Sequence, residues 1–130
     1  MDTKMDTREV VKRYFDSVNA EDWDGWLELF DENVVMDEQL AGHLEGVDTL
    51  RGAVEGLKKG YSRFQNIPLE TLVDGDRATV LWRIEAANAK GVPINAKGAN
   101  FFRIKDGKIT YMANFHDTVP FKPFTEQKLD

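Results

Sequence analysis

Three polar side chains stand inside two strand-like, mostly apolar runs near the end of the chain. Asn100, Asn114 and His116 lie within residues 98–117, away from the turn between the two runs. A buried amide or imidazole that lacks a hydrogen-bond partner costs about 1–3 kcal/mol. These groups are therefore either satisfied by partners inside the protein, or they line a cavity that binds a polar molecule.

Two further pairs of charged residues could take part in chemistry. Asp37 and Glu38 end a short apolar run, whereas Arg83 and Glu85 alternate with the apolar residues of a longer run. Paired acids at a strand end are usually solvated, but a positioned carboxylate can act as a general base. The chain has no cysteine and only two histidines, so thiolate chemistry is excluded and no convincing metal-ligand spacing is present. We expect neither a metal nor a cofactor.

Composition limits the classes of partner. A length of 130 residues, with 42% apolar and 31% charged residues, suits one folded domain with a single core. The net charge of -6 argues against a nucleic-acid surface, because phosphate binding requires clustered Lys and Arg. No apolar run approaches the ~20 residues of a membrane span, and the acidic, polar start is unlike a signal peptide. We expect a cytoplasmic protein that binds neither nucleic acid nor membrane.

Apolar spacing predicts helices first and strands afterwards. Helices are expected over residues 7–20, in a short segment around 23–30, and from Asp48 to about Gly60, with a short strand at 34–36. Four longer strands follow, at residues 66–74, 78–88, 93–104 and 108–118. This order indicates an α+β fold in one domain, residues 1–130.

The domain is expected to have a core and a tail. The predicted elements place the core in residues 7–118. The tail, residues 119–130, contains two prolines and therefore cannot be a central strand. We expect it to cover a pocket mouth or a sheet edge.

Three segments and their order resemble the nuclear transport factor 2-like superfamily, in its SnoaL-like and ketosteroid isomerase-like branch. The segments are NAEDWDGWLELF at 19–30, DENVV at 31–35 and FFRIKDGKI at 101–109. The resemblance implies a curved antiparallel sheet wrapped around three N-terminal helices into a cone, with a deep apolar pocket and often a homodimer. The superfamily includes isomerases, dehydratases, cyclases, epoxide hydrolases and binding modules without chemistry, so fold alone does not fix function.

The resemblance to ketosteroid isomerase-like members implies three catalytic positions. Their first-helix tyrosine, which donates to a substrate oxyanion, matches Tyr14. Their base, a carboxylate at the end of the first strand, matches Glu38, or Asp37 if the register slips by one residue. Family members often have Asp-Pro there, whereas this chain has Glu38-Gln39. Their protonated acid falls on Asn100, whose amide can donate without titrating. A core tyrosine, a solvated strand end and a structural asparagine are the alternative interpretations.

Family register also implies which other residues face the pocket. Arg83 and Glu85 would point inward as a bonded ion pair, similar to the Arg and carboxylates of the related epoxide hydrolases. The matching acid on the last strand is replaced by Asn114. His116 would lie in the pocket with Glu85 and Asp37 as candidate partners. The remaining expected ligand-binding residues are Met36, Phe102 and Met112.

The register of the last hairpin decides whether its polar residues share one face. A two-residue turn would separate Asn100 from Asn114 and His116. A three-residue loop at 105–107, with its last residue in a bulge, would place all three on one face. Family register favours the bulged loop, and this is our prediction.

Together these positions predict an enzyme without a cofactor that moves a proton next to a carbonyl, as an isomerase, dehydratase or aldol-type cyclase does. Glu38 would remove the proton, while Tyr14 and Asn100 would donate hydrogen bonds to the enolate oxygen. The ligand would be a small hydrophobic or partly polar molecule. The alternatives are a non-catalytic hydrophobic-ligand-binding or dimerisation domain, and hydrolysis of the epoxide hydrolase kind.

A homodimer through the outer face of the sheet is also expected, because apolar residues on that face would need covering. The residues assigned to this face are Val80, Trp82, Ile84 and Phe101.

Overall fold

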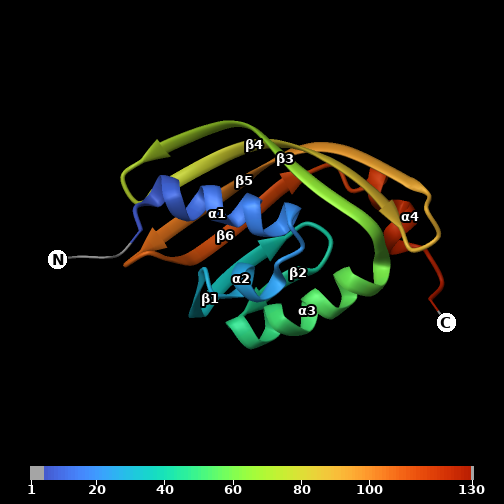
Figure 1. The fold of residues 1–130 in the computed structure, drawn as a ribbon, viewed down its shortest axis with the longest axis horizontal. Coiled ribbons are helices and arrows are strands. Elements are labelled where there is room, and N and C mark those ends of the chain that lie inside the picture. The colour runs from blue at the N-terminus through green and yellow to red at the C-terminus, as the bar shows by residue number, and fades with distance from the viewer. Residues whose placement is uncertain (1–4, 130) are drawn as a thin grey trace.

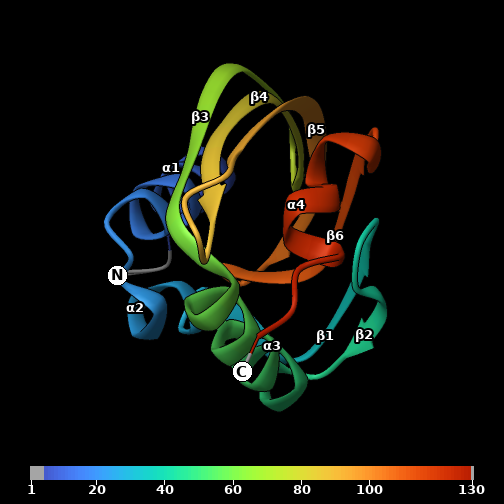
Figure 2. The same cartoon turned by 90° about the vertical axis from the view of Figure 1, so that its right-hand side faces the viewer.

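A single curved sheet wraps around three helices in the computed structural model, which describes residues 5–129. Six strands lie in the order β2-β1-β6-β5-β4-β3. Figure 2 shows the sheet arching over the helices and remaining open at its ends. The strands are β1 (Phe30–Glu38), β2 (Gly42–Glu45), β3 (Tyr61–Asp74), β4 (Arg77–Asn88), β5 (Pro93–Lys105) and β6 (Lys108–His116). The predicted α+β class with a curved sheet is confirmed.

The helices lie on the concave side of the sheet and close the core (Figures 1 and 2). They are α1 (Thr7–Asn19), α2 (Trp23–Leu27) and α3 (Val47–Gly60). The Asp6 side chain caps α1 by accepting from the backbone N–H of Glu9 at 2.8 Å. The buried stripe of α1 includes Tyr14 and Phe15, so amphipathic spacing directs this helix into the core.

Two features of the sheet differ from the expected meander. β1 pairs with β6 in parallel, because β1 enters the sheet beside the last strand of the chain. The sequence predicts a loop at residues 42–46, where few side chains are apolar. These residues instead form β2, which pairs antiparallel with β1 from Val35 opposite Glu45 to Glu38 opposite Gly42.

The β5–β6 hairpin reaches the predicted face by a different turn. Lys105 pairs with Lys108, and both residues between them have positive φ, as a two-residue type I′ turn requires. The predicted three-residue loop is wrong. The register instead shifts further along, between Arg103 and Ile104, so that Arg103 lies opposite Tyr111. This one-residue shift returns the side chains beyond it to the predicted face. Asn100 therefore lies opposite Asn114 and on the same face as Met112 and His116.

The orientation predicted for β4 is wrong. Trp82 is only 1% exposed and points into the concave side, whereas Arg83 and Glu85 lie on the convex face, roughly half exposed. The apolar residues of β4 occupy the same face as Asn100, because Val80 on β4 lies directly opposite Asn100 on β5. Burying a tryptophan is favourable and burying an ion pair is not, which accounts for this choice of face.

The tail folds back over the open end of the cone (Figure 2). It forms η1 (Val119–Phe121) and α4 (Lys122–Thr125). Phe124 stacks on Tyr61 with ring centroids 4.3 Å apart, and the Asn88 amide donates to the backbone oxygen of Pro123 at 2.8 Å. The tail is therefore part of the folded domain.

Candidate active site

An apolar cavity of about 340 Å³ lies between the concave face of the sheet and the helices. The strands supply most of its polar groups, α1 supplies the Tyr14 hydroxyl, and the tail supplies Phe121, Phe124 and Thr125. The polar side chains in its lining include Tyr14, Glu38, Asn66, Asn100, Asn114 and His116. Met36 and Met112 add to the apolar wall.

Glu38 is fixed by three donors at the end of β1. One carboxylate oxygen accepts from the backbone N–H groups of Leu40, at 2.8 Å, and Ala41. The other accepts from the side-chain amide of Asn114 at 3.1 Å. The Asn114 oxygen in turn accepts from the backbone N–H of Gln39 at 2.9 Å, and this donor-only group sets the direction of the amide. The carboxylate therefore has one defined position in the cavity wall.

Asn100 is held equally firmly on β5. It is 2% exposed, and its side-chain oxygen accepts from the indole N–H of Trp82 at 2.9 Å. An indole nitrogen can only donate, so this bond assigns the oxygen and turns the NH2 group the other way. That NH2 group donates to the Met112 sulfur at 3.9 Å, which is a weak partner. The amide hydrogens remain available to a ligand.

Tyr14 supplies a second donor beside Asn100. Burial raises the pKa of its hydroxyl far above the ordinary value, the nearby Asn100 amide and Trp26 indole oppose this, and the charge of Glu38 adds to it. The hydroxyl is therefore a neutral donor at physiological pH. The Trp26 indole N–H lies nearby but has no partner in hydrogen-bond geometry among residues 5–129.

Four predicted site residues lie outside the cavity lining. Arg83 and Glu85 form their ion pair, 3.4 Å between nitrogen and oxygen, on the convex face. Phe102 is fully buried in the core and packs its ring 5.0 Å from that of Tyr14. Asp37 points away from the cavity, because alternate residues of a strand face opposite sides.

Asp37 belongs instead to a polar cluster on the convex face. Its carboxylate lies 2.6 Å from the His43 imidazole and accepts from the Tyr111 hydroxyl at 2.6 Å. The other imidazole nitrogen lies 3.3 Å from Glu45. The bonds from Tyr111 and His43 lower the pKa of Asp37, and the bond to Asp37 raises the pKa of His43. The register slip that would exchange Asp37 for Glu38 does not occur.

His116 lines the cavity, but its predicted partners are wrong. Its ring lies 4.8 Å from that of Phe121 and 5.7 Å from that of Trp82, and its Nδ1 lies 2.8 Å from the backbone oxygen of Asp117. Glu85 and Asp37 both face the opposite side of the sheet, because successive side chains along a strand point to alternate faces.

Sequence reasoning missed Tyr61 and Trp82. Tyr61 begins β3 and lines the cavity, and its pKa is raised first by burial and then by the charge of Glu38. The sequence feature that could have pointed to Tyr61 is its position directly after Gly60, where a helix is predicted to end. Family register assigns Trp82 to a dimer surface, so its role in orienting Asn100 could not be recognised.

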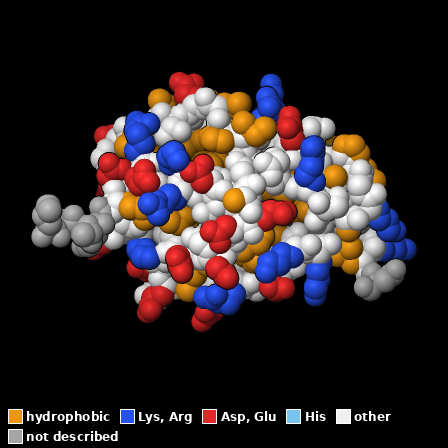
Figure 3. Space-filling view, in the orientation of Figure 1, with side chains coloured by type: hydrophobic (Ala, Val, Ile, Leu, Met, Phe, Trp, Pro, Cys, Tyr) orange, Lys and Arg blue, Asp and Glu red, His pale blue; other side chains and the backbone are white. Residues whose placement is uncertain are grey.

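Other kinds of site find little support in the described chain. Within residues 5–129, no three His, Cys, Asp or Glu side chains are placed to hold a metal ion. None of the helices described is long and apolar enough to cross a membrane. Lys and Arg alternate with Asp and Glu over the face in Figure 3, without a continuous basic patch on that face.

Residues 11–112 match the family described as SnoaL-like domain. The chain belongs to this family. A comparison with curated proteins gives no match. Solved structures similar to this SnoaL-like chain share its fold, and three of them show how far the similarity extends.

Each of these three structures is less than 25% identical to the chain. An NTF2-like protein of unknown function from Burkholderia pseudomallei K96243 is 16% identical with a TM-score of 0.85, covering 93% of this chain and 98% of its own. A candidate polyketide cyclase from Pseudomonas putida KT2440 is 23% identical with a TM-score of 0.81, covering 96% and 99%. A protein with a ketosteroid isomerase-like fold from Catenulispora acidiphila DSM 44928, in complex with trimethylamine, is 13% identical with a TM-score of 0.81, covering 94% and 95%.

Proposed function

We propose that this SnoaL-like protein is an enzyme that moves a proton next to a carbonyl without a cofactor. One observation carries the proposal: a fixed carboxylate, Glu38, and a buried donor pair, Tyr14 and Asn100, line the same apolar cavity. A base and an oxyanion site are the two parts that enolisation requires. The fold shared with a candidate polyketide cyclase supports this class of chemistry.

The reaction begins when Glu38 removes a proton from the carbon next to a substrate carbonyl. The electron pair of the broken C–H bond moves to the carbonyl oxygen, which becomes an enolate. Tyr14 and Asn100 donate hydrogen bonds to that oxygen, and the surrounding apolar wall strengthens both bonds. Protonated Glu38 then returns the proton to another carbon of the enolate, to a β-hydroxyl that leaves as water, or to the alkoxide formed when the enolate attacks a second carbonyl. These outcomes correspond to an isomerase, a dehydratase and an aldol-type cyclase.

Deuterium exchange tests the proposal whichever of these products is formed. The protein is incubated in D₂O with a panel of enolisable ketones and 1,3-diketones, and loss of the α-proton signal is followed by NMR. We expect exchange above the buffer rate, and Glu38→Gln should lower the enzymatic rate by about 10²–10⁴-fold. Asp37→Asn is the matched control, because it alters the neighbouring carboxylate on the opposite face. Equal rates for wild type and Glu38→Gln would remove Glu38 from the mechanism.

A second candidate function is a non-catalytic binding domain for small hydrophobic ligands. The observation that favours it is the bonding of Glu38 to Leu40 and Ala41, which closes the turn after β1 as a structural carboxylate would. In that case apolar ligands and phenols should bind in the cavity while no ketone exchanges faster than in buffer. The epoxide hydrolase alternative is not retained, because its Arg83–Glu85 pair lies on the convex face.

We also propose that the convex face forms a homodimer, for a different reason than the sequence suggested. Val80, Trp82 and Ile84 are buried in the monomer. A row of Leu81, Ala99 and Phe115 crosses β4, β5 and β6 on the convex face instead, with Leu81 44% and Phe115 58% exposed. Light scattering at micromolar concentration should give twice the 14.8 kDa chain mass. Phe115→Lys should give the monomer, and a monomeric wild type would contradict the proposal.

A further inference from the structure

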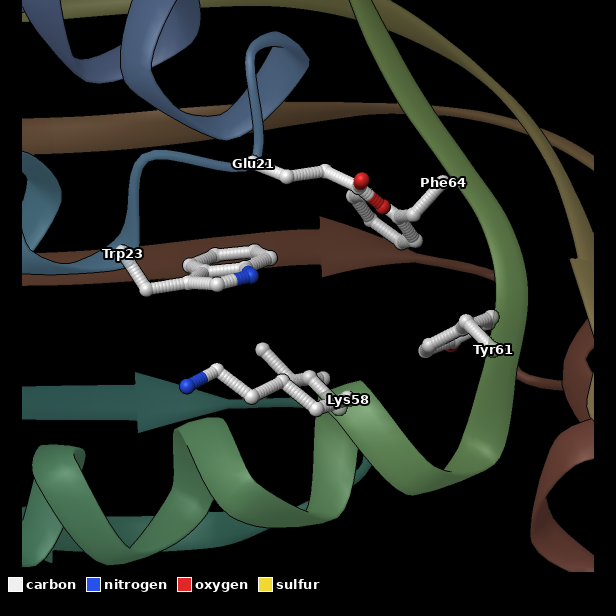
Figure 4. Close-up of a pocket in the computed structure, with 6 residues that line it drawn as sticks. Glu21, Trp23, Lys58, Tyr61 and Phe64 are labelled. Atoms are coloured by element: carbon white, nitrogen blue, oxygen red, sulfur yellow. The ribbon is translucent and has the colours of Figure 1, made fainter.

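A second pocket, of about 310 Å³, adjoins the cavity. Figure 4 shows Trp23 and Tyr61 extending toward the same open space, with Phe64 on β3 and Lys58 on α3 at its sides. Trp23, Leu57, Tyr61 and Phe64 line both this pocket and the cavity. We call this space the entrance pocket, and these four shared side chains separate it from the cavity.

The entrance pocket has one carboxylate and one ammonium group in its lining. Glu21 lies in its lining, is exposed, and has no hydrogen bond or ion pair from its carboxylate among the described residues. The ammonium of Lys58 lies 3.6 Å from Glu55, a carboxylate of the same helix outside the lining, so these three side chains together carry one net negative charge. The faces of aromatic rings also carry negative electrostatic potential, although one face of Tyr61 is covered by Phe124. A ligand group with a positive charge is therefore favoured there.

The backbone at Glu21 adds an independent observation. The N–H of Asp22 bonds to the oxygen of Ser17 at 2.9 Å and the N–H of Glu21 to that of Val18 at 3.1 Å, which is the Schellman arrangement at the end of α1. Glu21 occupies the left-handed position of this motif, with φ 56. Glycine is preferred at this position because a Cβ is disfavoured there. The chain thus places a carboxylate beside the rings at a position where local structure favours a residue without a side chain.

We propose that the entrance pocket binds a methylated ammonium group, with Trp23, Tyr61 and Phe64 around the cation and Glu21 as its counter-charge. A methylated ammonium needs aromatic faces and one negative charge, as in aromatic cages. A primary ammonium has three N–H donors, and Glu21 is the one carboxylate in the lining of this pocket. This binding site is separate from the proton-transfer chemistry and does not require it.

Choline and its uncharged analogue 3,3-dimethylbutan-1-ol provide the test, because they share shape and differ in charge. Binding is measured by NMR titration of the wild-type protein at matched sodium chloride concentration. We expect choline to bind at least about tenfold more tightly than the alcohol. Glu21→Gln should remove most of this preference, whereas Glu32→Gln, an exposed carboxylate on β1, should leave it unchanged. Equal affinity for both ligands, or no binding of choline, would overturn the proposal.

A second variant separates binding from folding. Glu21→Gly should raise the thermal melting temperature, because glycine relieves the left-handed backbone, while the preference for choline is lost. A gain in stability with an unchanged preference for choline would show that Glu21 is not the counter-charge. The deuterium-exchange rate of the wild-type protein is measured in parallel, so failure of the cation site and failure of the proton-transfer proposal give different results.

Discussion

The two faces of the sheet use polar residues in opposite ways. On the concave face, Asn100 and Asn114 are oriented by an indole N–H and a backbone N–H, which can only donate. On the convex face, Asp37 is bonded to His43 and Tyr111, whose protonation depends on pH. The two amides of the cavity are therefore oriented by donors that do not titrate, whereas the partners of Asp37 on the convex face do. Asp37 and Glu38, adjacent on β1, point to these two opposite faces.

The largest difference in stability between the two faces is expected for substitutions of two neighbouring residues of β4. Trp82→Ala should lower the free energy of unfolding by about 3–5 kcal/mol, because it opens a hole in the core and leaves the Asn100 oxygen unpaired. Leu81→Ala, on the convex face, should cost about 0.5 kcal/mol or less when measured on the monomer. Urea denaturation measures both. Similar losses would contradict the assignment of the two faces.

A narrower change isolates the hydrogen bond to Asn100. Trp82→Phe removes the indole N–H, and the unpaired Asn100 oxygen should cost about 1–3 kcal/mol of unfolding free energy. Affinity for phenolate ligands should fall as well, because the amide of Asn100 loses its fixed direction. Trp26→Phe is the matched control, since the N–H of Trp26 has no partner in hydrogen-bond geometry among the described residues. Trp82→Phe should lose more phenolate affinity than Trp26→Phe. An equal loss in both variants would contradict the proposal that Trp82 positions Asn100.

On the convex face, stability should depend on pH through the Asp37–His43 pair. The folded pKa of His43 is raised above 6.5, so its contribution is complete below that pH and is lost as pH rises through the raised pKa. The folded pKa of Asp37 is lowered below 3.8, so its contribution is complete above that pH and is lost as pH falls through the lowered pKa. The stability difference between wild type and His43→Gln should therefore be larger at pH 5 than at pH 9. A difference that grows toward pH 9 has the wrong sign.

The smallest effect is expected from the convex ion pair. Arg83 and Glu85 are roughly half exposed and 3.4 Å apart, so Glu85→Gln should change the free energy of unfolding by less than about 0.5 kcal/mol. Chemical denaturation at low and high salt measures this. A loss of several kcal/mol would show that the pair is buried by a partner, which would strengthen the case for the dimer.

The sequence predicted which polar residues share the concave face better than it predicted the turn and register that bring them together. Family register placed Asn100, Asn114 and His116 on one face through a bulge at Gly107. The structure has no bulge at Gly107, and the unpaired residue of the register shift is Thr110, which carries no local signal for it. The orientation of β4 failed because family register was preferred over its own alternation, in which Val80, Trp82 and Ile84 already form the apolar side. Cross-strand partners such as Trp82 and Asn100 are 18 residues apart, and no local pattern reveals such a bond.

The folded tail is expected to limit how fast large ligands enter and leave the cavity. Phe121, Phe124 and Thr125 belong to the lining, and the tail is held by the stack on Tyr61 and by the bonds from Asn88 to Pro123 and from Gln127 to Gly60. We expect exchange of a ligand too large for the entrance pocket to require undocking of these residues. In stopped-flow mixing, the observed rate for such a ligand should level off at high concentration, at a value set by tail opening rather than by the chemistry of the ligand.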